Sequence, residues 1–100
     1  MAKGYWIARV DVNDPEAYRA YLAANGAVFE KFGARFLVRG ETSEQVEGTG
    51  RQRNVVLEFP SYERALACYR SPEYQPVKAL RLAASEADIL VIEGYDGPQP

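Results

Sequence analysis

Residues 53–74, RNVVLEFPSYERALACYRSPEY, decide the fold because they hold a strand, its stop and two helix starts in succession. Apolar residues alternate over 53–59, which predicts a half-buried strand. Its two faces hold Val55, Leu57 and Phe59 on one side and Val56 and Glu58 on the other. Pro60 ends this strand, and Ser61 is a suitable N-cap for a short helix running through Tyr69.

The pair Ser71-Pro72 repeats the cap-then-proline signal and predicts a helical segment to about Ala84. Pro76 is expected to disturb that segment, because proline cannot donate a hydrogen bond to the carbonyl of Pro72. Residues 87–93 then predict the last strand, and residues 94–100 a tail.

The chain upstream of this stretch starts with an alternating pattern at 4–12, which predicts a strand. Its faces hold Trp6, Ala8 and Val10 on one side and Tyr5, Ile7, Arg9 and Asp11 on the other. Asp14-Pro15 predicts a helix start, and Gly33 suits a left-handed helix end. The apolar stripe of this helix is interrupted by Asn25 and consists of Tyr18, Tyr21, Leu22, Phe29 and Phe32.

Residues 34–39 predict a second strand, with Phe36 and Val38 on one face, and residues 40–52 a long hairpin loop. Arg35, Leu37 and Arg39 share its other face if the alternation is regular. The resulting order, βαββαβ, is typical of an α+β domain with a four-stranded antiparallel sheet and its helices on one face. We expect one domain over 1–94 and a C-terminal tail over 95–100.

The sheet face without helices combines apolar and charged residues, whereas a solvated face should be more uniformly polar. It carries Ile7, Leu37, Val56, Arg9, Arg35, Arg39 and Glu58, together with either Ile89 and Val91 or Leu90 and Ile92. We therefore expect a second copy of the chain to cover this face in a homodimer.

Composition excludes several classes of function. The net charge is -2, from 12 Lys+Arg and 14 Asp+Glu, so no strong positive field attracts nucleic acid. No segment approaches the ~20 apolar residues that cross a membrane. The sequence contains no histidine, which excludes Ser-His-Asp and Cys-His catalysis and histidine-ligated metals. With Cys68 as the single cysteine, we expect a cytoplasmic protein without metal or cofactor.

Arg39, Glu58, Tyr74 and Arg81 are the candidate ligand-binding residues, with Glu58 and Tyr74 as candidates for moving a proton. Guanidinium groups bind carboxylates in a bidentate manner, and Tyr74 and Arg81 share one helical face. The alternative is that Arg35, Arg39 and Glu58 form a cross-strand ion pair without any ligand. We interpret Glu47-Gly48 as a turn rather than a lid, and Cys68 as a small core residue.

Four motifs in this order resemble the DUF1330 family: Arg39-Gly40, Glu47-Gly48, Glu58-Phe59-Pro60 and Ser71-Pro72-Glu73-Tyr74. The resemblance covers about residues 4–94. It implies a ferredoxin-like fold that dimerises sheet to sheet as a dimeric α/β barrel. The wider superfamily includes cofactor-independent monooxygenases, isomerases, decarboxylases and haem-degrading enzymes, but the family itself has no assigned function.

Three functions remain open from the sequence. The chain is a cofactor-independent oxidoreductase or isomerase-type enzyme with a pocket for an anionic metabolite, a non-catalytic small-ligand-binding protein, or a purely structural dimer. Fold resemblance favours the enzyme but does not establish it.

Overall fold

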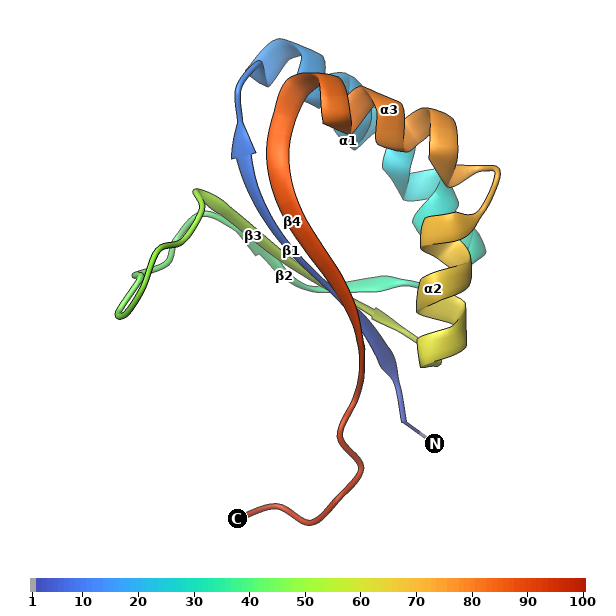
Figure 1. Ribbon diagram of the computed structural model, residues 1–100. Helices are drawn as coiled ribbons and strands as arrows, with labels where there is room; N and C mark the ends of the chain where they lie inside the picture. The colour runs from blue at the N-terminus through green and yellow to red at the C-terminus, as the bar shows by residue number, and fades with distance from the viewer. Residues whose placement is uncertain (1) are drawn as a thin grey trace.

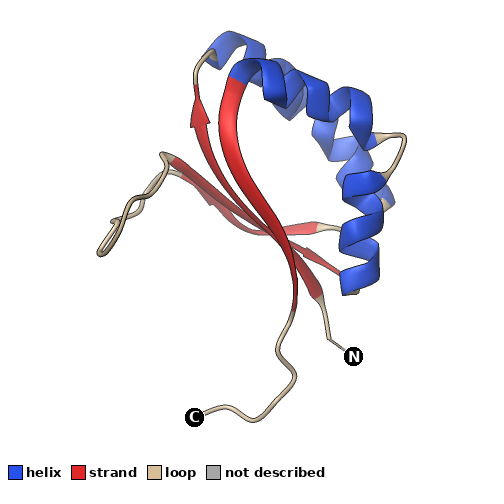
Figure 2. Cartoon of the chain, in the orientation of Figure 1, coloured by secondary structure: helices blue, strands red, loops and turns tan. Residues whose placement is uncertain are grey.

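Four antiparallel strands form one sheet, and three helices pack against one of its faces in the computed structural model, which describes residues 2–100 (Figure 1). The strand order is β2-β3-β1-β4. The elements are β1 (Gly4–Val12), α1 (Pro15–Lys31), β2 (Arg35–Gly40), β3 (Arg53–Phe59), α2 (Tyr62–Arg70), α3 (Tyr74–Ala84) and β4 (Ser85–Glu93). The predicted α+β fold is therefore confirmed. The β2–β3 loop and the C-terminal segment extend away from the helices (Figure 2).

The expected helix starts and stops are present. Asp14 accepts a hydrogen bond from the backbone N–H of Ala17 at 3.1 Å, and Pro15 occupies the first helical position of α1. Gly33 has a φ of 76°, which glycine adopts without a Cβ penalty, and the chain leaves the helix there. The Ser61 hydroxyl caps α2 by accepting from the N–H of Arg64 at 3.1 Å.

Helix α3 corrects the expectation for Pro76. The helix begins at Tyr74, so Pro76 lies in its first turn, where backbone N–H groups have no partner within the helix. The proline therefore causes no disturbance, and α3 continues to Ala84. The Ser71 hydroxyl organises this start, since it accepts from the N–H of Tyr74 at 3.1 Å and donates to the Cys68 carbonyl at 2.8 Å.

Trp6 is the centre of the core between the sheet and the helices. Its side chain is 1% exposed, and its indole N–H donates to the carbonyl of Ala65 at 2.8 Å. The ring centroids of four aromatic residues lie 5.2–5.5 Å from it: Phe29, Phe59, Tyr69 and Tyr74. Aromatic pairs at such separations contribute beyond the area they bury. The indole thus fixes α2 and α3 against β1.

An irregularity in the edge strand β2 changes which side chains face the helices. Arg35 pairs with Glu58 as expected, but the register shifts between Phe36 and Val38, and Arg39 pairs with Val55. After a bulge of this kind, each following side chain points to the opposite face of the sheet from the one that regular alternation predicts. Because Val55 belongs to the helix-covered face, Arg39 does too. The expectation that Arg35 and Arg39 share a face is therefore wrong.

The helix-free face is partly apolar. In β4, Leu90 pairs with Ile7 and Ile92 pairs with Tyr5. Leu90 and Ile92 therefore belong to the helix-free face, and Ile89 and Val91 do not. Leu90 and Ile92 are about half exposed. Val38, beyond the bulge, adds a further exposed apolar side chain.

Gly4 is required by a close approach between β1 and the start of α2. A Cβ at this position would collide with the carbonyl oxygen of Ser61 and the Cα of Tyr62, both backbone atoms that move little. We expect Gly4→Ala to lower the free energy of unfolding by about 1–3 kcal/mol, as overpacking does.

Gly26 provides the matched control, because it lies within α1 and a Cβ there meets no atom within 4 Å. Gly26→Ala is expected to raise the free energy of unfolding by about 0.5–1 kcal/mol through helix propensity. Urea unfolding measures both changes. Equal effects of the two substitutions would contradict the close approach at Gly4.

Candidate functional site

A small cavity of about 30 Å³ lies between the sheet and helices α1 and α3. We call it the inner cavity. Its walls are aromatic and apolar except for a group of polar side chains. The aromatic residues are Trp6, Tyr18, Tyr21, Phe29 and Phe36, and the polar residues other than tyrosine are Asn25, Arg39, Arg53 and Arg81.

Three arginines from three elements converge on this cavity. Arg81, on α3, is 4% exposed, and its Nε has no hydrogen-bond partner. The Nε of Arg53, at the start of β3, is likewise buried without a partner. Arg39, on β2, also lines the cavity but is exposed to solvent, and its guanidinium lies 4.3 Å from the centroid of the Phe36 ring. Within residues 2–100, no ion pair joins any of the three to a carboxylate.

This arrangement is costly without an anion. A buried charge is normally paired with an opposite charge, because removing it from water is unfavourable. Burial opposes the charge of Arg81, but the nearby hydroxyl groups of Tyr74 and Tyr21 raise the pKa of its guanidinium on balance. The arginine therefore stays charged, and the inner cavity is strongly electropositive.

Tyrosines surround Arg81. The hydroxyl groups of Tyr21 and Tyr74 lie 2.8 Å apart, with Tyr21 at the cavity wall and Tyr74 fully buried behind it. Burial raises the pKa of Tyr21 well above its ordinary value. Burial also raises the pKa of Tyr18, although Arg53 and Arg81 act in the opposite direction. Both hydroxyl groups are therefore protonated near neutral pH and act as hydrogen-bond donors rather than bases.

A larger and more open space of about 290 Å³ adjoins the inner cavity. We call it the outer cavity. The two share Tyr18, Leu22 and Arg53 as lining residues, so Arg53 stands at their junction. The remaining lining residues of the outer cavity are Val12, Pro15, Arg19, Glu41 and Gln52.

The structure brings together only part of the predicted site. Arg39 and Arg81 line the same cavity. Tyr74 does not line it, but its hydroxyl is hydrogen-bonded to that of Tyr21, which does. Glu58 does not join them, since it lies on the helix-free face and accepts from the Tyr5 hydroxyl at 3.1 Å. Its carboxylate is 3.5 Å from Arg35, which is the cross-strand ion pair of the alternative interpretation. The predicted convergence is therefore wrong for Glu58.

Sequence reasoning missed Arg53, although a signal was present. Arg53 is in phase with Val55, Leu57 and Phe59, so the alternation of β3 already placed it on the core face. Asn25 gave a similar signal as the polar interruption of the α1 stripe, and it is buried at the cavity wall.

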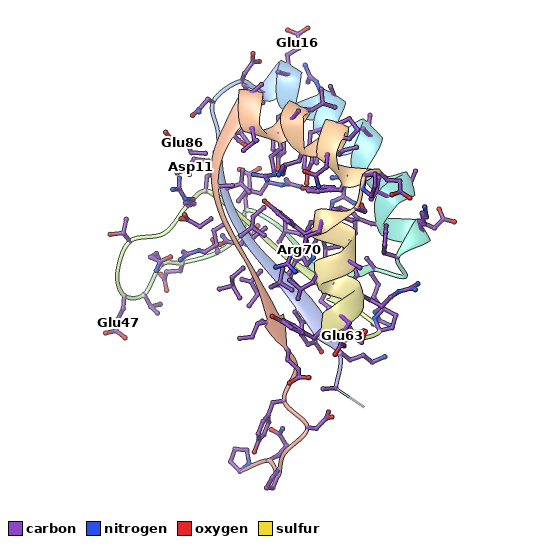
Figure 3. The ribbon with its side chains drawn as sticks, turned by 45° about the vertical axis from the view of Figure 1, so that its right-hand side comes forward. Asp11, Glu16, Glu47, Glu63, Arg70 and Glu86 are labelled. Atoms are coloured by element: carbon purple, nitrogen blue, oxygen red, sulfur yellow. The ribbon has the colours of Figure 1, made fainter. Side chains whose placement is uncertain are left out.

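Two other residues considered from the sequence lie outside the cavity. Glu47 is exposed at the tip of the β2–β3 loop and points away from the helices (Figure 3), as a turn residue does. Cys68 is fully buried, and burial raises the pKa of its thiol to about 12. A thiol of this kind is a packing element without nucleophilic character at neutral pH.

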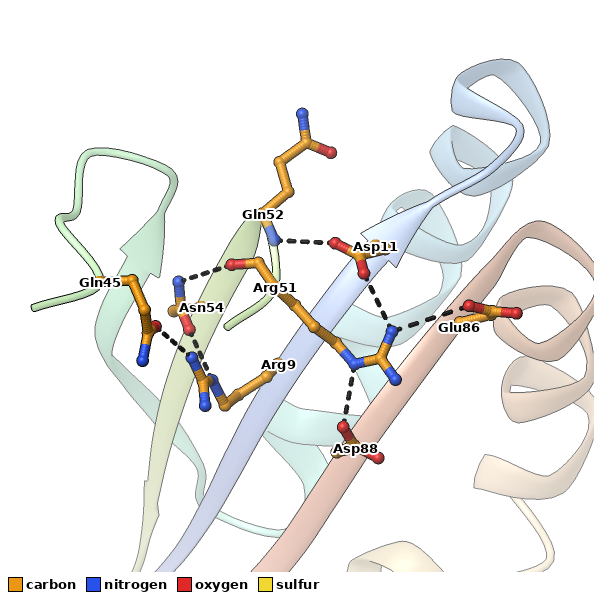
Figure 4. Close-up of polar contacts among 8 residues, drawn as sticks. All are labelled: Arg9, Asp11, Gln45, Arg51, Gln52, Asn54, Glu86 and Asp88. Atoms are coloured by element: carbon orange, nitrogen blue, oxygen red, sulfur yellow. Dashed lines mark hydrogen bonds and ion pairs between the residues drawn. The ribbon is translucent and has the colours of Figure 1, made fainter. Parts of the chain in front are cut away.

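A second group of charges occupies the helix-free face (Figure 4). Arg51 donates to Asp88 at 2.9 Å and to Asp11 at 3.0 Å, and Glu86 lies 3.8 Å from it. Here three carboxylates compensate the charge of the Arg51 guanidinium, whereas the neighbouring Arg9 donates to the amide oxygens of Asn54 and Gln45. The contacts tie the end of the β2–β3 loop to the sheet.

Among residues 2–100, no group of three or more His, Cys, Asp or Glu side chains is arranged to hold a metal ion. No helix in that range is long and apolar enough to cross a membrane.

Comparison with solved structures identifies proteins of the same fold. A protein of unknown function from Rhodopseudomonas palustris has 21% identity and a TM-score of 0.76 over 96% of this chain and 85% of that chain. SnoaB from Streptomyces nogalater, a cofactor-independent oxygenase, has 14% identity and a TM-score of 0.66 over 100% and 97%. A dimeric ferredoxin-like protein of unknown function from Thermobifida fusca has 13% identity and a TM-score of 0.57 over 92% and 89%.

The sequence comparisons give a family and no individual relative. The family model for a domain of unknown function, DUF1330, matches residues 3–95. No curated protein was found to match the chain. At these identities the structural neighbours establish the ferredoxin-like fold alone.

Proposed function

The chain belongs to the DUF1330 family, and we propose that it binds a small organic anion whose acidic group enters the inner cavity. The observation that carries this proposal is the convergence of Arg39, Arg53 and Arg81 without a carboxylate partner among the described residues. An anion supplies the missing counter-charge, and each guanidinium offers it charge-assisted hydrogen bonds.

The size of the inner cavity limits what enters it. Its volume of about 30 Å³ is two to three times the ~10–15 Å³ that a cavity needs to hold one water molecule. A carboxylate or an enolate oxygen fits such a space, whereas a complete metabolite does not. The carbon skeleton of the ligand therefore lies in the outer cavity, against Tyr18 and Leu22.

Catalysis is the second candidate, and the tyrosine hydroxyls favour it. Arginines and protonated tyrosines aimed at one point stabilise negative charge that develops on a substrate oxygen. We propose a cofactor-independent reaction of the oxidoreductase or isomerase type through an enolate or phenolate, in line with the oxygenase SnoaB. Tyr21 donates to that oxygen, and Tyr74 orients Tyr21. Without histidine or a carboxylate in the described wall, the substrate must itself be acidic.

We also propose that the working unit is a homodimer joined through the helix-free faces. The half-exposed Leu90 and Ile92 support it, as does the dimeric neighbour from Thermobifida fusca. A specific interface of this type buries ~1,600 Å² or more in total. The single cysteine is compatible with a reducing cytoplasm, which we propose as the location.

Arg39→Ala tests the anion site. Trp6 is the only tryptophan of the sequence and lines the inner cavity, so its fluorescence reports occupancy. In titrations with sodium acetate and butyrate at constant ionic strength, we expect Arg39→Ala to weaken binding about 10-fold or more. The free energy of unfolding without anion should change by less than about 1 kcal/mol, because only a cation–π contact is lost.

Glu58→Gln is the matched control, since it removes a charge from the helix-free face. It should leave the affinity for both carboxylates unchanged. Wild-type protein that binds neither carboxylate would contradict the proposed function. Loss of affinity in Glu58→Gln but not in Arg39→Ala would assign the binding to the other face of the sheet.

A further inference from the structure

The inner cavity carries more positive charge than one acidic group can neutralise. Arg39, Arg53 and Arg81 all line it, and among the described lining residues there is no carboxylate. A single bound carboxylate leaves one charge uncompensated between Arg81 and Arg53, whose Nε atoms are buried without a partner, whereas Arg39 is exposed to water. Uncompensated charge in buried surroundings is unfavourable, and the like charges also repel one another.

The outer cavity offers space for a second acidic group and shares Arg53, Tyr18 and Leu22 with the inner cavity. The inner cavity is filled by one carboxylate, whereas the outer cavity offers about 290 Å³. Arg53 lines both spaces and has a buried Nε without a partner. Arg19, on α1, adds a further guanidinium to the outer wall, and Glu41 is the acidic residue found among the described residues there. The outer wall therefore keeps a net positive charge.

We infer that the ligand is a short organic acid with two acidic groups. Arg81 and Arg39 hold the first group in the inner cavity, and Arg53 and Arg19 hold the second in the outer cavity. This inference rests on the proposed function and adds the chemical class of the ligand. The position of Arg53 at the junction sets the two groups close together, as in a dicarboxylate with a chain of one or two carbon atoms between its carboxylates.

Matched pairs of acids test the inference through Trp6 fluorescence and thermal unfolding of the full chain. Malonate is compared with propionate and succinate with butyrate, because the members of each pair have equal numbers of carbon atoms. Each dicarboxylate is expected to bind at least about 10-fold more tightly than its partner, which is the effect of one additional charge-assisted contact. Inorganic phosphate tests whether a single doubly charged group binds as tightly as two separate carboxylates.

Variants assign the second group to its arginine. In Arg19→Gln, the ratio of succinate to butyrate affinity should fall to about one, whereas Arg70→Gln, on the exposed side of α2, should keep the wild-type ratio.

Equal binding of the paired acids by wild-type protein, with both lost in Arg81→Met, would overturn the inference and leave the anion site intact. Phosphate that binds as tightly as succinate would also overturn it. Binding of none of these anions would contradict the proposed function itself.

Discussion

Arg81→Met is expected to make the protein more stable in the absence of anions while it removes affinity for small carboxylates. Methionine keeps most of the apolar volume of the arginine stem and removes a charge that is 4% exposed and unpaired at Nε. Replacing a buried ion pair by apolar residues of similar volume is often neutral or stabilising by about 1–4 kcal/mol, and a buried charge without a counter-charge is less favourable than a pair. Urea unfolding in buffer of low anion concentration measures this gain.

The same substitution should weaken acetate and succinate binding by about 10- to 150-fold, the equivalent of one charged hydrogen bond of about 1.5–3 kcal/mol. Opposite changes in stability and affinity are characteristic of a residue retained for binding. Arg70→Met is the control, because Arg70 is an exposed arginine of α2 (Figure 3) and should change neither quantity beyond about 0.5 kcal/mol. A loss of stability in Arg81→Met would instead identify Arg81 as a structural residue.

Leu90→Arg is expected to convert the proposed dimer into a monomer. Leu90 lies on the helix-free face of β4 and is half exposed in the single chain. A twofold interface contains the substituted residue of both chains. Each unpaired charge buried at such a contact costs about 2–5 kcal/mol, so the dissociation constant of the dimer should rise by more than about 100-fold. Light scattering after size exclusion should give twice the 11.2 kDa chain mass for wild type and the single mass for the variant.

Leu82→Arg is the matched control, because Leu82 is an exposed leucine on α3, on the helix side of the sheet. It should remain dimeric. A wild-type protein that elutes with the mass of one chain at micromolar concentration would contradict the dimer. A dimeric Leu90→Arg together with a monomeric Leu82→Arg would move the interface to the helices.

The fold was accessible from the sequence because each element carries local signals that agree with one another. Asp14-Pro15 and Ser61 mark helix starts by capping chemistry, and Gly33 marks an end by its left-handed conformation. Alternation in β1 and β3 then gave the two faces of the sheet. Pro76 was misjudged because the helix start was placed at Pro72 rather than at Tyr74, and position within the first turn decides whether proline is tolerated.

The site could be predicted from the sequence only in part, because its geometry depends on the irregular pairing of β2 with β3. Three consecutive apolar residues, Phe36, Leu37 and Val38, stand at the centre of β2, and their pattern does not reveal the shift of register between Phe36 and Val38. Regular alternation therefore assigned Arg39 to the side of Glu58. The same alternation would have placed Arg53 correctly, but an arginine at the end of an apolar series is easily interpreted as the edge of a strand.

The bulge in β2 also affects how this protein should be compared with its relatives. A relative that lacks the irregularity presents the residue aligned with Arg39 to the opposite surface of the sheet, although the column of the alignment looks the same. An arginine shared at that column therefore does not demonstrate a shared role, and an arginine displaced by one position can preserve it. Homologues are therefore better grouped by which residue of β3 pairs with the position of Arg39 than by sequence identity at that position. In the present chain the pairing residue is Val55.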